Sequence, residues 1–182
     1  QIEEAVGEEI QEYYRTECPE CGDHHADTMY NFWVKMLPCR NCGEDVPLFK
    51  DYALAQARSS KDDYYNVVCP DCWNVVKADD RKGETACPDC SRSFTPSKAG
   101  HVSRSKYTCP HCEEEPTMSI IESVERFGKP REELYAVEYY CSERDEKGYK
   151  SAEGFDRDLF QEAGEELDDV RESLPLPTQE RY

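Results

Sequence analysis

The chain has 182 residues, of which 40 are acidic and 22 are Lys or Arg, giving a formal net charge of −18. Apolar residues make up 37 %, below the roughly 45–50 % of ordinary globular domains, so we do not expect one large hydrophobic core. The charge argues against a strongly basic nucleic-acid or membrane-surface module. No apolar run is long enough for a transmembrane helix, and we expect a cytoplasmic protein without a membrane partner. Because the chain begins at Gln1 without Met or a leader, we expect a piece of something longer.

Residues 1–15 are predicted to form an amphipathic helix. Ile2, Val6 and Ile10 recur at helical spacing, and glutamates lie on the opposite face. The segment is acidic almost all round and would be marginal alone. We expect it to continue a preceding domain that is absent from this sequence.

Eleven cysteines dominate the rest of the chain. Ten form five C-x-x-C pairs: Cys18/Cys21, Cys39/Cys42, Cys69/Cys72, Cys87/Cys90 and Cys109/Cys112, with Cys141 left over. Repeated C-x-x-C suits a tetrahedral thiolate metal site better than a disulfide scaffold. No βαβ pattern surrounds the pairs, which argues against thioredoxin-like redox chemistry.

The residues around each pair predict the tight turn, or knuckle, that a metal site needs. Pro follows the first Cys in four of the pairs, and Gly follows the second Cys in two, where a positive φ is expected. Trp73, Ser91 and Glu113 take the Gly position in the other three pairs, at an expected cost of at most about 1 kcal/mol each.

The spacing of the pairs predicts two zinc ribbons in series. Cys21 and Cys39 enclose 17 residues and Cys72 and Cys87 enclose 14, close to ribbon spacing. Neighbour pairing gives ribbon 1 over residues 16–58 (Cys18, Cys21, Cys39, Cys42) and ribbon 2 over residues 64–100 (Cys69, Cys72, Cys87, Cys90). Nested pairing, such as Cys39/Cys42 with Cys69/Cys72, stays open. Strands are predicted at 28–37, 46–49, 64–68 and 73–77, with a short helical turn and a polar loop within 51–63.

A third, degenerate ribbon is predicted over residues 101–150. Cys109 and Cys112 would join Cys141 across 28 residues, but the position of the fourth ligand holds Arg144, which cannot bind zinc. The site is then empty, three-coordinate with water, or completed by another residue: His101, His111, Glu143 or Asp145. A strand at 101–108, an inserted helix at 117–127 and a strand at 134–140 are expected. Residues 151–182 are predicted to form a helix over 156–173 and a linker.

These elements predict a small metal-stabilised β fold of tandem zinc ribbons with flanking α-helices, α+β overall. Several Cys₄ sites in series with polar loops favour two or three structural Zn²⁺ ions. Iron in sites that resemble rubredoxin, and hence electron transfer, is the alternative. A filled zinc site contributes on the order of 10 kcal/mol of folding free energy, which small cores cannot supply. His24 and His25 are expected to be loop histidines, and no catalytic motif is present.

The acidic composition is most simply read as a surface adapted to high salt, as in a haloarchaeal cytoplasm. Salt screens the net charge, so a few local cations can still contact DNA. The candidates for DNA contact are Arg40, Arg92, Lys98, Arg104 and Lys106, with Trp33, Trp73 and Tyr107 as stacking aromatics. The simpler interpretation is that these aromatic residues pack the ribbons.

Several stretches resemble the zinc-ribbon insertion of predicted adenine-specific (N6) DNA methyltransferases. They are Phe32-Trp-Val-Lys35, Cys39-Arg-Asn-Cys-Gly-Glu-Asp-Val-Pro-Leu-Phe49, Tyr65-Asn-Val-Val-Cys-Pro70, Leu134-Tyr-Ala-Val-Glu-Tyr-Tyr-Cys141, Asp145-Glu-Lys-Gly-Tyr-Lys150 and the tail Leu174-Pro-Leu-Pro-Thr-Gln-Glu180. The resemblance covers roughly residues 16–182, and Arg144 departs from it.

The resemblance implies a parent enzyme that uses S-adenosylmethionine and methylates the adenine amino group, often within restriction-modification or phage defence. Its catalytic and cofactor loops would lie outside this chain, so the resemblance carries only the knuckle cysteines over, as zinc ligands. The predicted partner is the catalytic core of the parent, and DNA is a second candidate partner. A freestanding zinc-ribbon adaptor that binds protein or nucleic acid is the alternative.

Overall fold

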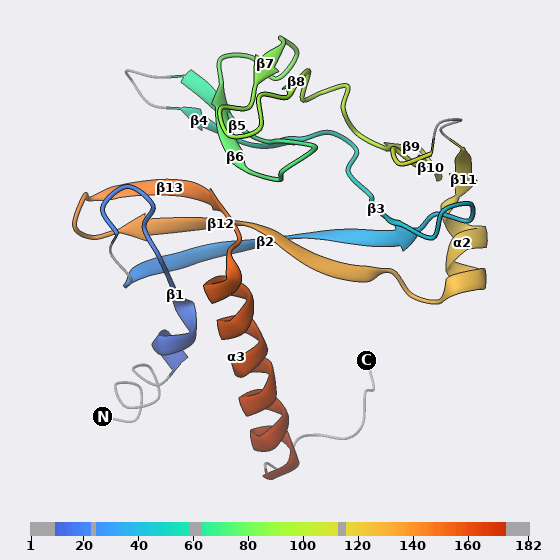
Figure 1. Cartoon of the computed structure of the whole chain (residues 1–182). Helices are drawn as coiled ribbons and strands as arrows, with labels where there is room; N and C mark the ends of the chain where they lie inside the picture. The colour runs from blue at the N-terminus through green and yellow to red at the C-terminus, as the bar shows by residue number, and fades with distance from the viewer. Residues whose placement is uncertain (1–9, 23–24, 59–62, 113–115, 174–182) are drawn as a thin grey trace, which may run out of the picture. The chain divides into compact units, whose positions relative to one another are not determined.

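The computed structural model describes residues 10–22, 25–58, 63–112 and 116–173 (Figure 1). This part of the chain is mostly β, with two α-helices. It divides into two compact units. Unit 1 combines residues up to 30 with 139–148 and the segment from 152 onward, and unit 2 comprises 31–138 and 149–151. A mostly β fold that carries cysteine clusters agrees with the predicted small metal-stabilised β class.

The largest sheet runs in the order β1-β2-β12-β13, with β3 paired to β2. Its strands are β1 (Arg15–Thr16), β2 (Ala26–Pro38), β3 (Asp45–Pro47), β12 (Arg131–Cys141) and β13 (Glu146–Ser151). The predicted strands at 28–37, 46–49 and 134–140 are thereby confirmed, although β3 starts and ends earlier than expected. The start of β2 pairs antiparallel with β1, and the end of β2 pairs antiparallel with β3.

Unit 2 also contains smaller antiparallel sheets, in the orders β4-β5-β6, β7-β8 and β11-β10-β9. Their strands are β4 (Ala53–Arg58), β5 (Asp63–Val68), β6 (Val75–Ala78), β7 (Thr85–Ala86), β8 (Ser93–Phe94), β9 (Val102–Ser103), β10 (Lys106–Thr108) and β11 (Thr117–Ser119). The strand expected at 64–68 is confirmed as β5. The strand expected at 73–77 is confirmed as β6, which starts two residues later.

Two local predictions for unit 2 are wrong. The helical turn expected within 51–63 is the strand β4, because pairing with β5 outweighs the helix propensity of its alanines. The strand expected at 101–108 is a hairpin of β9 and β10, which turns at Arg104 with a φ of 57°.

The helix α2 (Ile120–Phe127) is delimited by its caps. The Ser119 hydroxyl accepts a hydrogen bond from the backbone N–H of Glu122 at 3.4 Å. Gly128 ends the helix with a φ of 89°, and its N–H donates to the Val124 carbonyl. The helix starts later than the predicted residue 117, because residues 117–119 pair with β10 instead.

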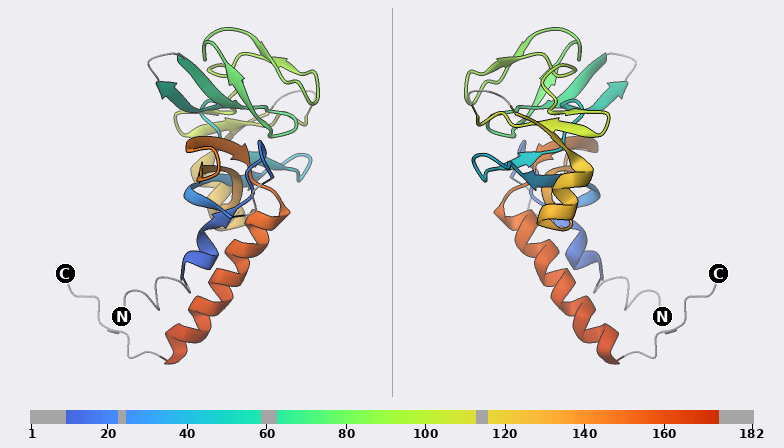
Figure 2. Two further views of the ribbon diagram at one scale, coloured as in Figure 1. Left: turned by 90° about the vertical axis from the view of Figure 1, so that its left-hand side faces the viewer. Right: turned by 90° about the vertical axis from the view of Figure 1, so that its right-hand side faces the viewer.

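Unit 1 contains the 3₁₀ turn η1 (Glu12–Tyr14) and the helix α3 (Gly154–Ser173), which Figure 2 shows as one uninterrupted helix. The Tyr13 hydroxyl donates to the Glu166 carboxylate, and the buried Thr16 hydroxyl donates to Asp156. The predicted final helix at 156–173 is confirmed. Most of the helix predicted at 1–15 lies outside the described residues. Among the described helices, none combines the length and apolar character needed to cross a membrane.

The hydrophobic core is divided into four small clusters, and three of them contain two buried cysteines each. These pairs are Cys39 with Cys109, Cys69 with Cys87, and Cys18 with Cys141. The fourth cluster packs Phe49 and Tyr52 against residues of β2 and β5. This division agrees with the low apolar content, and buried cysteines contribute to three of the four clusters in the described part of the chain.

Candidate metal centres

The cysteine side chains gather into three groups, in each of which all the sulfur atoms lie within 4.8 Å of one another. The groups are Cys39/Cys42/Cys109/Cys112 (quartet A), Cys69/Cys72/Cys87/Cys90 (quartet B) and Cys18/Cys21/Cys141 (the trio). Quartets A and B lie in unit 2, and the trio lies in unit 1. All eleven cysteines fall in the described part of the chain, and none of them forms a disulfide.

The distances between sulfur atoms match a tetrahedral metal site. The Sγ atoms of Cys39 and Cys112 are 3.7 Å apart, as are those of Cys42 and Cys109. In quartet B the corresponding distances are 3.5 Å, for Cys69–Cys90 and Cys72–Cys87. A Zn–S bond of about 2.3 Å gives a tetrahedral edge of about 3.8 Å. A disulfide needs only about 2.05 Å, so the sulfur atoms are spaced for a shared ion.

The same backbone turn recurs at four of the knuckles. The carbonyl of the first cysteine accepts a hydrogen bond of 2.8–3.0 Å from the N–H of the residue after the second cysteine. The four donor residues are Gly22, Gly43, Trp73 and Ser91. In all five C-x-x-C pairs the first cysteine is buried and the second is more accessible. Each turn therefore presents one inner and one outer thiol to the site.

The predicted positive φ after the second cysteine is confirmed. Gly22 and Gly43 have φ values of 72° and 80°, and Trp73 and Ser91 have values of 64° and 61°. The turn thus imposes a left-handed conformation even where a side chain makes it costly. Glu113 lies outside the described residues.

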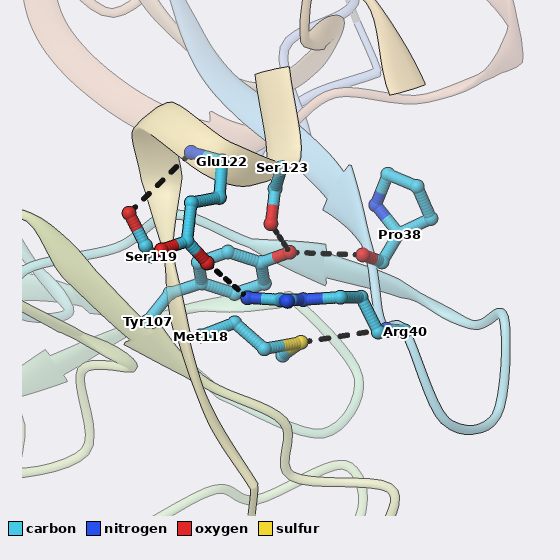
Figure 3. A network of polar contacts seen from close by, with 7 residues as sticks. All are labelled: Pro38, Arg40, Tyr107, Met118, Ser119, Glu122 and Ser123. Atoms are coloured by element: carbon cyan, nitrogen blue, oxygen red, sulfur yellow. Dashed lines mark hydrogen bonds and ion pairs between the residues drawn. The ribbon is translucent and has the colours of Figure 1, made fainter. Parts of the chain in front are cut away.

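A buried hydrogen-bond network joins the two knuckles of quartet A (Figure 3). The Tyr107 hydroxyl lies 2.9 Å from both the Pro38 carbonyl, to which it donates, and the Ser123 hydroxyl on α2. Pro38 directly precedes Cys39, and Tyr107 is fully buried two residues before Cys109. The phenol therefore ties the two strands that enter quartet A to the helix that covers them.

A second set of contacts joins Arg40, in the first knuckle of quartet A, to β11 and α2. The Arg40 guanidinium pairs with the Glu122 carboxylate at 2.9 Å, and the Arg40 backbone N–H points at the Met118 sulfur at 3.4 Å (Figure 3). The first knuckle is thus held against β11 and α2. No local sequence pattern predicts this network, because its members lie far apart in the chain.

The predicted membership of quartet B is confirmed, and the predicted partners of the other cysteines are wrong. Cys39 and Cys42 join Cys109 and Cys112 instead of Cys18 and Cys21. A ribbon needs two strands and a turn between its knuckles, but residues 26–38 form one continuous strand. Closing the longer loop to Cys109 costs little extra, because the loop-closure entropy grows only with the logarithm of loop length.

The thiols resist joint ionisation unless a cation is present. Desolvation beside the other sulfur atoms, together with hydrogen bonds to those thiols, raises the pKa of Cys72 and of Cys112 to about 12, although both are the more accessible cysteines of their pairs. Burial opposes ionisation of Cys39 too, but the N–H groups of Cys42 and Asn41 help to lower its pKa to about 7. Within one quartet a first thiolate is therefore stabilised and further ones are penalised, which is the charge pattern that a divalent ion relieves.

The trio includes no fourth ligand from the described part of the chain. Cys21 and Cys141 have their sulfur atoms 3.5 Å apart, and no described His, Asp or Glu joins them. His101, His111, Glu143 and Asp145 were suggested to complete a site of Cys109, Cys112 and Cys141, but these three cysteines do not form one group and none of the four residues joins any of the groups. Arg144 is bound to Glu146 at 2.9 Å.

The structure assigns packing or pairing roles to several of the candidate DNA-contacting residues. Tyr107 is buried, and Trp73 stacks edge-on against Phe49 with ring centroids 5.8 Å apart. Arg40 and Arg92 pair with acidic neighbours. Unit 2 nevertheless has a surface cavity of about 800 Å³, whose lining includes Trp73, Arg92, Lys98, His111, Glu44 and Asp71.

Comparisons with known proteins found no match to this chain among protein-family models, curated proteins or solved structures. The assignment of function therefore depends on the cysteine geometry and on the sequence resemblance.

Proposed function

We propose that this chain is a zinc-stabilised scaffold module in which quartets A and B each hold one structural Zn²⁺. The observation that carries the proposal is the sulfur spacing of 3.5–3.7 Å within both quartets. Four thiolates fill a tetrahedral zinc ion and leave no position for a substrate, so such sites stabilise structure. The module accordingly has an accessory role, as a binding or positioning element.

Elemental analysis of the purified chain tests this proposal. We expect a colourless protein with at least two zinc ions per chain that persist through dialysis. A coloured protein that contains iron in their place would contradict zinc and favour electron transfer. A protein without any tightly bound metal would overturn the scaffold proposal altogether.

We further infer that the module is an insertion in an S-adenosylmethionine-dependent adenine-specific DNA methyltransferase. The resemblance of the segments around Cys39, Cys69 and Cys141 supports this inference. The module would contact the catalytic core of the parent enzyme and shape DNA or protein recognition, while the core carries out methyl transfer. The flanking coding DNA tests it: an open frame with a glycine-rich cofactor motif and an Asp-Pro-Pro-Tyr-type tetrapeptide is expected.

A freestanding adaptor is the second candidate function. The cavity in unit 2 favours it, because its lining combines an aromatic surface (Trp73) with cationic (Arg92, Lys98) and acidic (Glu44, Asp71) groups. A start codon directly before Gln1 and a stop codon after Tyr182 would favour the adaptor over the insertion. Fluorescence anisotropy with DNA at several salt concentrations checks for direct contact, since binding to phosphates weakens as salt rises.

A further inference from the structure

Within the described residues, the trio supplies three ligands and each quartet supplies four. Its three sulfur atoms come from the Cys18/Cys21 knuckle and from the end of β12, at Cys141. Cys18 and Cys141 are buried and Cys21 is exposed, so the group reaches the surface on one side.

Backbone hydrogen bonds shape both the Cys18/Cys21 knuckle and the turn that begins at Cys141. The Gly22 N–H donates to the Cys18 carbonyl at 2.8 Å, as in the knuckles of the quartets. The Arg144 N–H donates to the Cys141 carbonyl at 3.3 Å, so residues 141–144 form a turn in which the last position carries a guanidinium. That guanidinium bonds to the Glu146 carboxylate.

We propose that the trio binds a third zinc ion through three thiolates and leaves its fourth position to an imidazole nitrogen from outside the chain, such as a histidine of a partner protein. This inference rests on the proposed zinc-binding function and assigns the trio a different role within it. Three protein ligands and one open position are the arrangement in which zinc exchanges ligands, whereas four thiolates are the closed arrangement.

The charge around the trio favours a neutral donor. Zn²⁺ with three thiolates carries a net charge of −1, and a fourth anionic ligand would make it −2 in a chain whose net charge is already −18. The Glu20 carboxylate interacts electrostatically with both Tyr139 and Arg144 and lies in the same neighbourhood. Imidazole adds no charge and is a common zinc ligand, so it completes the tetrahedron at the lowest electrostatic cost.

The packing around Tyr139 fixes two of the three ligands of the trio. The Tyr139 side chain is almost fully buried. Tyr139 and Cys18 also belong to the same core cluster as Cys141, so the ligands are fixed by packing.

Cobalt substitution of the full chain, with free imidazole as the probe, tests the proposal. We expect three Co²⁺ ions per chain and a change in the visible spectrum of one of them when imidazole is added. Arg144→Cys supplies the missing fourth thiol and should abolish the response, whereas the matched control Arg144→Ala should keep it. His24 lies outside the described residues, and His24→Ala should leave the spectrum of the cobalt protein unchanged.

Metal release gives a readout that does not require the spectra. With a zinc chelator, one of three zinc ions should leave at least about tenfold faster than the others. A tenfold ratio of rates corresponds to a difference of about 1.4 kcal/mol in activation free energy. Arg144→Cys should remove that fast phase.

The outcomes separate this inference from the scaffold proposal. Two bound ions and an empty trio would overturn the open-site inference and leave the scaffold proposal intact. Three ions without an imidazole response, or a spectrum altered by His24→Ala, would also overturn it, because the fourth position would then be filled from within. A chain that binds no metal would overturn both.

Discussion

Ser91 adopts a φ of 61° directly after Cys90, where two of the other knuckles have glycine. A side chain in this left-handed backbone conformation costs of the order of 1 kcal/mol. Because Ser91 is exposed, packing does not offset this cost. We expect Ser91→Gly to raise the free energy of unfolding by about 0.5–1 kcal/mol, as measured by chemical denaturation of the zinc-loaded protein. Ser103→Gly in β9 is the control and should lower it. A loss of stability in both variants would show that the turn does not select for glycine.

Tyr107 and Tyr52 are both almost completely buried, yet only one hydroxyl has a described partner. The Tyr107 hydroxyl bonds to Pro38 and Ser123, whereas the Tyr52 hydroxyl has no hydrogen-bond partner in the described part of the chain. Tyr107→Phe should therefore cost about 1–3 kcal/mol, because it leaves buried polar groups unsatisfied. Tyr52→Phe should be neutral or stabilising, because it removes a buried group that already lacks a partner. Thermal denaturation of the two variants in parallel checks this pair, and equal losses would contradict the role of the network.

At the scale of the elements, the sequence predicted the strands better than their partners. The side chain two residues before the first cysteine is buried at Leu37, Val67 and Tyr107, near the end of the strand that runs into each knuckle. That signal is local and can be found in the sequence. The partners of Cys39 depend instead on the uninterrupted run of β2 and on the contacts of α2, which are set by tertiary packing. For the same reason, the alanines of β4 pair as a strand against their helix propensity.

The pairing of the cysteines can be measured with two single variants at the accessible second position of a knuckle. In quartet A, Cys112→Ser should remove one of the two chelator-resistant zinc ions, since Cys112 lies 3.7 Å from Cys39. In the trio, Cys21→Ser should leave both resistant ions in place, because Cys21 is grouped with Cys18 and Cys141. The resistant zinc is counted by elemental analysis after exposure to a chelator.

Ribbon pairing by neighbours makes the opposite prediction for both variants. Cys21 would then belong to a complete site with Cys39 and Cys42, and Cys112 would belong to the incomplete one. Loss of a resistant ion in Cys21→Ser, together with retention of both in Cys112→Ser, would therefore contradict the observed grouping. Cys90→Ser in quartet B should cost one resistant ion under either pairing, and it serves as the positive control.

The whole molecule has an unusual balance between its core and its charge. The packing of the described residues is divided among four small clusters, and the chain carries 40 acidic residues against 22 Lys or Arg. Under the proposed function, zinc binding is a principal source of folding free energy, because structural zinc sites are coupled to folding. Chelation of zinc at neutral pH should consequently unfold unit 2, which contains both quartets, and not merely loosen the knuckles.

Acidification should show the same coupling, with a sign that follows from the thiols. A free thiol has an ordinary pKa of about 8.5, so zinc binding displaces protons and falling pH returns them, which releases the metal and the stability with it. If four protons replace each ion, a tenfold rise in free zinc should shift the midpoint of unfolding to lower pH by about 0.25 units. Tryptophan fluorescence recorded against pH at two zinc concentrations measures this shift. Acid unfolding driven only by protonation of the carboxylates would give the same midpoint at both concentrations, and that result would contradict zinc as the stabilising ligand.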